Sequence, residues 1–330
     1  MTRALVARAP TRLDFGGGWT DVPPYCDREG GAVCNLAIAR YATATVATDG
    51  HVAARSGAAT AADERILRAT LRHSQISHIQ ARLSNDFPVG AGLGGSSAAG
   101  VALAGALAAL AGTPLTRRAL AASSRRTEVE ELGVPGGFQD HYAAAFGGAL
   151  LLTFESGDVG VEQIVLSTDA ITQLERRCVL VYTGESRISG DTIVTVTNAY
   201  LSGKPRVIDA LARMKALALD MAAALRADDL NALGALVGEH WTHQRALHPA
   251  IPTARIDAII NAATRSGALG AKALGASGGG CVVAIAEDGR EGELVRALAP
   301  LGERLGFTID TGGFDVLAVL EGQDRFQGEP

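Results

Sequence analysis

The feature that most constrains this chain is a glycine-rich turn that runs without a break into an uncharged, alanine-rich helix. The turn and helix occupy residues 88–112, with the sequence PVGAGLGGSSAAGVALAGALAALAG. Glycines remove Cβ atoms where backbone has to approach a ligand, and Ser96 and Ser97 are good N-cap residues for the helix. At such a helix start several backbone N–H groups lack intrahelical partners and the macrodipole is positive. The stretch therefore predicts a phosphate-binding site.

Other interpretations of the same stretch compete with a phosphate site. Its glycines satisfy G-x-G-x-x-G, but that dinucleotide motif needs a preceding strand and an acidic residue about twenty positions later. Residues 85–88 lack a strand pattern and the first later carboxylate is Glu128, although Arg117 and Arg118 would suit the 2′-phosphate of NADP. A Walker phosphate loop is excluded because no lysine precedes the serine pair.

A membrane span and a purely structural helix are the remaining alternatives. Residues 89–115 carry no charge and are long enough to cross a bilayer. Their content is mostly alanine and glycine, however, with leucines on one face. This composition favours a helix buried within the protein.

Length and charge limit the overall organisation. The 330 residues exceed what one hydrophobic core usually serves, so we expect two domains, residues 1–172 and 173–330. The formal net charge of -5 argues against nucleic acid or an anionic membrane as partner. The four cysteines lie far apart and no secretory segment is evident, so we expect reduced thiols in the cytoplasm and no zinc site.

Three consecutive glycines near the N terminus mark a second candidate site. They occupy residues 16–18 and follow a short predicted strand over residues 3–9. Consecutive glycines are tolerated where backbone turns sharply or admits a ligand, which makes the neighbouring Arg12 and Asp21 candidate site residues. The alternative is a plain turn with a surface arginine and a turn-forming aspartate.

The hydrophobic periodicity of the rest of the chain predicts an α+β fold. An Asp49-Gly50 hairpin is expected within the strand-rich segment, and the glycine-rich residues 267–281 are expected to form a loop that packs over the first glycine turn. Strands are expected over residues 3–9, 32–56, 76–84, 149–155, 177–183, 282–286, 306–310 and 316–321. Besides the buried helix, helices are expected over residues 61–72, 116–132, 188–202, 205–227, 229–248, 253–266 and 292–298.

Three motifs in this order give the chain a resemblance to a known superfamily. They are APTRLDFGGGWTD at residues 9–21, PVGAGLGGSSA at residues 88–98 and KALGASGGGC at residues 272–281. Together they resemble the GHMP kinases, named for galactokinase, homoserine kinase, mevalonate kinase and phosphomevalonate kinase, over essentially the whole chain. The resemblance implies an N-terminal domain like the second domain of ribosomal protein S5 and a ferredoxin-like C-terminal domain, with ATP, Mg²⁺ and a small-molecule substrate between them.

The resemblance also implies roles for individual residues. Asp140, which could otherwise be a simple helix cap, matches the catalytic aspartate, and Arg12 matches the basic residue facing it. Ser97 and Glu128 match the metal ligands, with Glu130 as the second choice for the acidic one. The implied nucleotide ligands are Pro88, Gly90, Gly92, Leu93, Gly94, Gly95, Ser96 and Ser97. The implied sugar-binding residues are Gly17, Gly18, Thr20, Asp21, Gly137, Gln139, Arg187, Arg245, Gly278 and Gly279.

Within the superfamily, the chain looks most like kinases that phosphorylate the anomeric hydroxyl of a sugar. GGWTDVPPY is similar to the L-fucokinases, whereas GLGGSSAA and QDHYAAAFGG are similar to the heptose-7-phosphate kinases. The leading expectation is therefore a heptose-7-phosphate 1-kinase, with a free-sugar 1-kinase as its nearest rival. A substrate phosphate would need basic residues, and Arg40, Arg187 and Arg245 are candidates that could equally be surface charges.

Several points stay open at this stage. Ser277 stands where many relatives have glycine, and its hydroxyl could either contact a phosphate or simply be tolerated. A sensor that binds nucleotide and sugar without turnover is the alternative of another class. The anomer of the product, the pathway and the oligomeric state, with a homodimer as one option, do not follow from the sequence.

Overall fold

Two antiparallel sheets carry the fold of the residues described by the structure, a computed structural model that covers residues 3–48, 61–73, 79–155, 157–185 and 190–321. The first sheet has the order β10-β1-β2-β4-β5, and β3 also pairs with β2; the second has the order β7-β8-β6-β9. The strands of the first sheet are β1 (Arg3–Gly16), β2 (Gly31–Thr48), β3 (Ile79–Asn85), β4 (Ala149–Glu155), β5 (Asp158–Ile164) and β10 (Asp315–Glu321). Those of the second are β6 (Cys178–Tyr182), β7 (Ala268–Ala273), β8 (Cys281–Ala286) and β9 (Glu303–Arg304).

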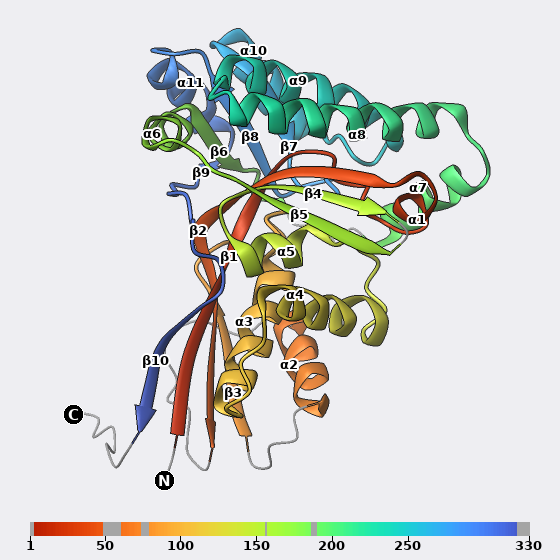
Figure 1. Cartoon of the computed structure of the whole chain (residues 1–330). Helices are drawn as coiled ribbons and strands as arrows, with labels where there is room; N and C mark the ends of the chain where they lie inside the picture. Colours follow the sequence, from red (N-terminus) through yellow and green to blue (C-terminus); the bar gives the residue numbers. More distant parts are fainter. Residues whose placement is uncertain (1–2, 49–60, 74–78, 156, 186–189, 322–330) are drawn as a thin grey trace.

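Helices cover both faces of the first sheet, with α2, α3 and α4 on one side and α8 and α9 on the other (Figure 1). Both ends of the described chain lie at the same end of the molecule, where β1 and β10 are paired. The helices are α1 (Tyr25–Glu29), α2 (Ala61–His73), α3 (Gly95–Leu110), α4 (Arg117–Arg125), η1 (Arg126–Glu131, a π-helix), α5 (Gln139–Phe146), α6 (Thr168–Arg177), α7 (Gly190–Leu201), α8 (Pro205–Arg226), α9 (Leu230–Leu247), α10 (Ala254–Arg265), α11 (Glu291–Leu298) and η2 (Ala299–Leu301, a 3-10 helix).

The uncharged helix α3 is buried on all sides, as its composition predicted. Every residue from 97 to 107 is buried, and the helix packs against β1 and β2 in the first core. A helix that is apolar all round is most stable when every face is buried inside the protein. Among the described residues, no helix combines the length and hydrophobicity that crossing a bilayer requires.

The long strand β1 changes face part-way along its length. Leu5 and Ala9 pack in the core under α3, but Leu13 and Phe15 pack in the core on the other face of the sheet. Between Pro10 and Thr11 the register shifts, because Pro10 pairs with Tyr41 and Thr11 with Ile38, and an irregularity of this kind bends and twists the strand locally. The shift therefore turns the even-numbered polar residues of β1 toward the start of α3.

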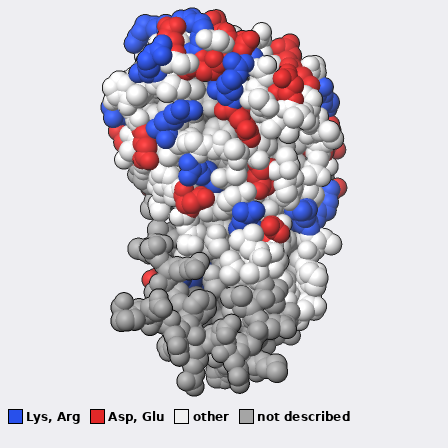
Figure 2. Space-filling view, turned by 90° about the vertical axis from the view of Figure 1, so that its left-hand side faces the viewer, with Lys and Arg blue, Asp and Glu red and all other residues white. Residues whose placement is uncertain are grey.

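The second half of the chain is mostly helical around the smaller sheet. α8 and α10 pack with β6, β7 and β8 in a third core, and the C-terminal strand β10 returns to pair with β1. The division into residues 1–172 and 173–330 remains a proposal; residue 172 lies within α6. In the view of Figure 2, lysine and arginine side chains alternate with aspartate and glutamate rather than gathering in one basic patch.

Most predicted elements are present, and four expectations are wrong. Ser96 and Ser97 do not cap α3, because the helix starts at Gly95 and its N-cap is Gly94. The predicted helix over residues 116–132 divides into α4 and η1, and the predicted loop over residues 267–281 begins with β7. Residues 306–310 form only an isolated bridge between Ile309 and Ile38. The predicted Asp49-Gly50 hairpin lies outside the described residues.

Candidate active site

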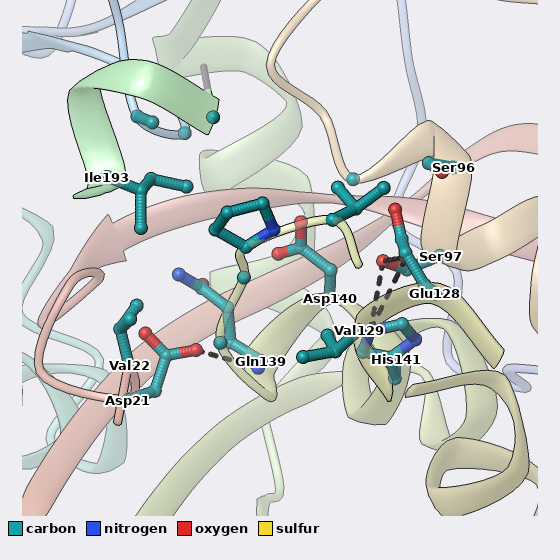
Figure 3. A pocket seen from close by; sticks show the side chains of 18 of the residues that line it. Asp21, Val22, Ser96, Ser97, Glu128, Val129, Gln139, Asp140, His141 and Ile193 are labelled. Carbon is teal, nitrogen blue, oxygen red and sulfur yellow. Dashed lines mark hydrogen bonds and ion pairs between the residues drawn. The ribbon is translucent and has the colours of Figure 1, made fainter. Parts of the chain in front are cut away.

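One cavity of about 500 Å³ collects most of the residues singled out in the sequence. Its walls come from β1, the loop after β1, α2, the turn before α3, η1, α5, α7 and the loop between β7 and β8. Figure 3 shows ten of the lining residues with labels. The implied site residues that line it are Arg12, Gly18, Asp21, Gly92, Gly94, Ser96, Ser97, Glu128, Gly137, Gln139 and Asp140. Residues far apart in the sequence thus surround one volume large enough for small ligands.

The glycine turn leaves the start of α3 open. Gly90, Gly92 and Gly94 all have positive φ, at 71°, 72° and 77°, while the residues between them do not. Alternating backbone of this kind gathers N–H groups into a concave anion site. Because Gly94 provides no side-chain cap, the first N–H groups of α3 are left for another acceptor.

The loop between β7 and β8 packs over this turn, as its glycine content predicted. The Cys281 N–H donates to the Ala91 carbonyl at 2.8 Å, and a Cβ on Gly92 would be 2.8 Å from the Leu274 carbonyl oxygen. Ser277 does not face the cavity contents, however, because its hydroxyl accepts from Gln244 Nε2 at 2.9 Å. Its φ of 66° is left-handed, a conformation that favours glycine.

Arg12 and Asp140 form an ion pair beside the glycine turn. Arg12 Nη2 lies 2.6 Å from Asp140 Oδ1, and Nε donates to the same oxygen at 2.8 Å. Arg12 Nη1 also donates to the Gly92 carbonyl at 2.6 Å, so the guanidinium ties the aspartate to the turn. A Cβ on Gly94 would lie 3.1 Å from Asp140 Oδ2. The missing side chain therefore lets the carboxylate sit directly beside the helix start.

Ser97 and Glu128 meet on the opposite side of the helix start. The Ser97 hydroxyl donates to Glu128 Oε2 at 2.9 Å, and His141 Nε2 lies 3.5 Å from the same oxygen (Figure 3). Burial raises the pKa of Glu128, against the hydrogen bonds from Ser96 and Ser97. Burial also lowers the pKa of His141 to about 3, so the imidazole is neutral. Among the described residues, no lysine or arginine forms an ion pair with Glu128.

These contacts distinguish the two glutamates that were candidates for a metal ligand. Glu128 is largely buried and holds Ser97, whereas Glu130 is exposed and lies 3.7 Å from Arg125. A serine hydroxyl and a carboxylate are hard oxygen ligands of the type that Mg²⁺ prefers. A buried carboxylate that meets no lysine or arginine in the described part of the chain also fits a site that receives a cation.

Asp21 lies at the other end of the cavity and binds the start of α5. Its Oδ2 accepts the N–H groups of Phe138 and Gln139 at 2.8 and 2.9 Å. Burial raises the pKa of Asp21 to about 6, against these two hydrogen bonds. A Cβ on Gly137 would be 2.0 Å from Asp21 Oδ2, so glycine is required there for this contact.

A buried ion pair next to Arg12 on β1 was not predicted from the sequence. Lys272 Nζ, fully buried, donates to Asp14 Oδ2 at 2.9 Å and to the Asp14 carbonyl at 2.7 Å. Burial would raise the pKa of Asp14, but Lys272 and other nearby cations outweigh it and the pKa is lowered. Both residues belong to the first and third motifs, and alternation along β1 places Asp14 on the same side as Arg12. That alternation was the signal available in the sequence.

The remaining implied residues do not line the cavity, and most have a structural task. Thr20 donates to the carbonyls of Gly17 and Ala32, and a Cβ on Gly95 would meet the Phe87 ring at 2.2 Å. Leu93 is buried in the core, and the Pro88 carbonyl accepts a hydrogen bond from the Ala91 N–H. The Gly278 N–H donates to the Ile251 carbonyl, and Gly279 lies against the Glu185 carbonyl. Gly90 has positive φ, and Gly17 donates to His240 Nε2 at 2.9 Å.

Of the three arginines considered for a substrate phosphate, Arg40 and Arg245 are in the described chain, and each has a partner outside the cavity. Arg245 lies 3.1 Å from Asp257, and Arg40 donates to the Gly306 carbonyl at 2.7 Å. Neither is part of the cavity wall, and Arg187 lies outside the described residues. The arginines that do line the cavity within the described chain are Arg12 and Arg65.

Two protein-family models match this chain. Residues 58–148 match the GHMP kinases N terminal domain, and residues 221–300 match the GHMP kinases C terminal domain. The chain belongs to the GHMP kinases. The N-terminal match contains the glycine turn and α5, and the C-terminal match contains the loop that packs over the turn.

Individual GHMP kinases are similar along most of the chain. D-glycero-alpha-D-manno-heptose 7-phosphate kinase of Campylobacter jejuni is 27% identical over 318 residues, which cover 90% of this chain and 93% of that protein. L-fucokinase/L-fucose-1-P guanylyltransferase of Bacteroides fragilis is 28% identical over 363 residues, which cover 94% of this chain but only 38% of that protein. The crystal structure of a D-glycero-D-manno-heptose 1-phosphate kinase from Bacteroides thetaiotaomicron matches with a TM-score of 0.75 and 25% identity, covering 97% of this chain and 100% of that one.

Proposed function

We propose that this GHMP kinase transfers the γ-phosphoryl group of ATP to the anomeric hydroxyl of a heptose 7-phosphate. The observation that carries the proposal is the single cavity in which the open start of α3, the Ser97–Glu128 pair and the Arg12–Asp140 pair face one another. Phosphoryl transfer depends mainly on positioning and charge stabilisation. Those are the contributions that this set of residues can make.

The nucleotide phosphates would bind where the first N–H groups of α3 are uncapped. Gly92 and Gly94 have positive φ there, and the β7–β8 loop packs against the turn through the hydrogen bond from Cys281 N–H to the Ala91 carbonyl. Fixed N–H groups stabilise developing negative charge without reorganising during the reaction. Ser97 and Glu128 would hold Mg²⁺, which when bound neutralises charge on the phosphate oxygens.

Asp140 is positioned to accept the proton of the attacking hydroxyl. Arg12 holds Oδ1, which leaves Oδ2 beside Gly94 to receive that proton. The hydroxyl oxygen forms the new bond to the γ-phosphorus while the bond from that phosphorus to the bridging oxygen breaks, and ADP leaves. Arg12 holds the aspartate in place during this transfer and lies close enough to the turn to offset charge on the phosphoryl group.

The sugar would lie between Asp140 and Asp21. Asp21 accepts two backbone N–H groups through Oδ2, so its carboxylate is fixed as an acceptor for sugar hydroxyls. Gly18 lies in the same wall, and a Cβ there would approach Asp14 Oδ2 to 2.6 Å and Gln139 Nε2 to 2.9 Å. Its missing side chain therefore lets Asp14 and Gln139 approach the loop after β1 in this part of the wall.

A free-sugar 1-kinase is the second candidate, and the cavity wall gives it specific support. Within the described chain, Arg245 is paired with Asp257, and Trp19, Val22 and Ile193 are apolar members of the cavity wall. A substrate phosphate would be expected to meet basic side chains. L-Fucose is the free sugar to test first, because the GGWTDVPPY motif resembles L-fucokinases.

An ADP-release assay over a sugar panel separates the candidates. The panel contains D-glycero-D-manno-heptose 7-phosphate, L-fucose and D-galactose, each with and without Mg²⁺. We expect Mg²⁺-dependent turnover with the highest kcat/KM for the heptose phosphate. A highest value for L-fucose would replace the substrate, and tight ligand binding without any turnover would identify a sensor instead.

A further inference from the structure

A continuous set of hydrogen-bonding groups lies directly behind Ser97 and Glu128. His141, on α5, is buried, with its Nδ1 atom 2.9 Å from Ser124 Oγ and its Nε2 atom 3.4 Å from Ser97 Oγ. Ser124, on α4, also donates to the Ser97 carbonyl at 3.2 Å. A single imidazole thus joins α4 to the pair of groups at the start of α3 and on η1. Figure 3 shows the contacts of His141 with Ser97 and Glu128.

The surrounding backbone is shaped to admit this contact. A Cβ on Gly100 would come within 2.3 Å of Ser124 Oγ, so a larger residue at that position would push the serine away. Glu128 itself belongs to the π-helix η1, which directly continues α4. π-Helical turns are rare and are frequently found at functional sites.

The hydrogen-bond directions define which nitrogen carries the proton. Because the Ser124 hydroxyl donates to the Ser97 carbonyl, its oxygen accepts from His141 Nδ1–H. His141 Nε2 is then a lone-pair acceptor that faces the Ser97 hydroxyl. In the structure that hydroxyl donates to Glu128, which occupies a lone pair of the carboxylate.

We propose that His141, held by Ser124, is a positioning residue whose Nε2 accepts the hydrogen bond of the Ser97 hydroxyl when a cation binds. Transfer of this hydrogen bond from Glu128 to Nε2 leaves the oxygens of Ser97 and Glu128 free to face the cation together. Partners that orient metal ligands in this way commonly contribute 10–100-fold, roughly, to metal affinity. The inference rests on the proposed kinase function and on no titration of the imidazole.

The test measures metal–nucleotide coupling directly rather than turnover. Calorimetry gives the affinity for the ATP analogue AMP-PNP with saturating Mg²⁺ and again with EDTA, and the ratio of the two is the coupling. We expect His141→Leu to reduce the ratio by about 10-fold or more, with the affinity in EDTA unchanged. Ser124→Ala should reduce it in the same direction by less, because it frees the imidazole without removing it.

Two further variants keep the result interpretable. His141→Gln retains an acceptor and should restore part of the coupling, which a purely packing role would not produce. His243→Leu is the control, since His243 is on α9 and does not line the cavity. In steady-state assays, His141→Leu should raise the Mg²⁺ concentration for half-maximal rate more than it lowers kcat at saturating Mg²⁺.

The outcomes separate this inference from the proposed function. Wild-type coupling that is retained in a folded His141→Leu variant, or in Ser124→Ala if the leucine variant fails to fold, overturns the role of His141 alone. Equal losses of affinity with Mg²⁺ and with EDTA also overturn it, because they indicate general damage to the nucleotide site. Wild-type protein that shows neither coupling nor turnover would remove the proposed function and this inference together.

Discussion

The carboxylates on the two sides of the cavity differ in whether a basic side chain is paired with them. On what we call the paired wall, Asp140 and Asp14 are held by Arg12 and Lys272 at 2.6 and 2.9 Å. On the unpaired wall, formed by Ser97, Glu128 and His141, the described residues around Glu128 offer hydroxyls and a neutral imidazole but no basic ion pair. The paired wall balances its own charge, whereas the unpaired wall carries the buried charge that a cation would balance. The contrast explains why we assign metal binding to one wall and proton transfer to the other.

Removal of Lys272 should produce the largest effect, because it leaves Asp14 buried and without its main partner. Breaking a buried ion pair from one side typically costs about 3–5 kcal/mol. We expect Lys272→Met to lower the free energy of unfolding by an amount in this range, measured by urea denaturation.

The double variant Asp14→Asn/Lys272→Met is the control for this prediction. Removing both members of a buried pair costs less than removing one, so the double variant should recover a large part of the lost stability. If the single variant were as stable as the wild type, the paired wall would not depend on this ion pair.

Substitution of Asp140 should have the next largest effect, on turnover rather than stability. A general base typically contributes about 10²–10⁴-fold to a rate. We therefore expect Asp140→Asn to lower kcat by about 10²-fold or more while ATP affinity changes little. An anomeric hydroxyl is more acidic than an ordinary alcohol, which favours the lower end of that range. Normal turnover in the variant would refute the assigned role.

The pKa of Asp21 predicts a pH dependence of sugar binding. Burial raises this pKa to about 6. In the folded protein, Asp21 is therefore mostly protonated below pH 6 and mostly ionised above it, and the ionised form is the better hydrogen-bond acceptor. We expect kcat/KM for the sugar to fall about tenfold per unit below pH 6, with the affinity for ATP changing less. Asp21→Asn keeps an acceptor for the Phe138 and Gln139 N–H groups, so it should fold, bind sugar weakly and lack this acidic limb. An unchanged limb would place the titration elsewhere.

Substitution of Glu128 should have the smallest effect on stability and the opposite sign to that of Lys272. Glu128→Gln removes a buried charge that no basic residue of the described chain pairs with. We expect its free energy of unfolding, without metal, to stay unchanged or to rise by up to about 1 kcal/mol. A loss as large as that of Lys272→Met would erase the distinction between the two walls.

The sequence predicted the elements with strong local signals. The glycine turn, the apolar α3 and the helices of the second half follow from composition and periodicity, and they are present in the structure. Strand β5 was missed because its residues are mostly exposed and polar, which leaves little alternation to detect. β7 was missed because its glycines are typical of a loop. Gly270 is nevertheless needed in the strand, because a Cβ at this position would lie 2.0 Å from the Gly234 carbonyl oxygen on α9.

Site residues that belong to a recognisable motif were predicted from the sequence. The partners that these residues contact from distant segments were mostly not predicted. Arg12, Ser97 and Asp140 were singled out in sequence, and they surround one cavity. The partners of Asp14 and Ser97, namely Lys272 and the His141–Ser124 pair, depend on three-dimensional packing that the sequence spacing does not specify. Arg245 was expected near the substrate, but its partner Asp257 lies one helix away on α10 and could not be inferred from the sequence.

A crystal structure with Mg²⁺, AMP-PNP and a sugar acceptor would show directly whether one cavity holds the nucleotide phosphates, the metal ion and the acceptor hydroxyl. We expect the γ-phosphate at the N–H groups that begin α3, with Mg²⁺ on Ser97 and Glu128 and the anomeric hydroxyl at Asp140 Oδ2. Nucleotide bound in another cavity, or a metal ion held on the Asp14 and Asp140 side, would contradict it.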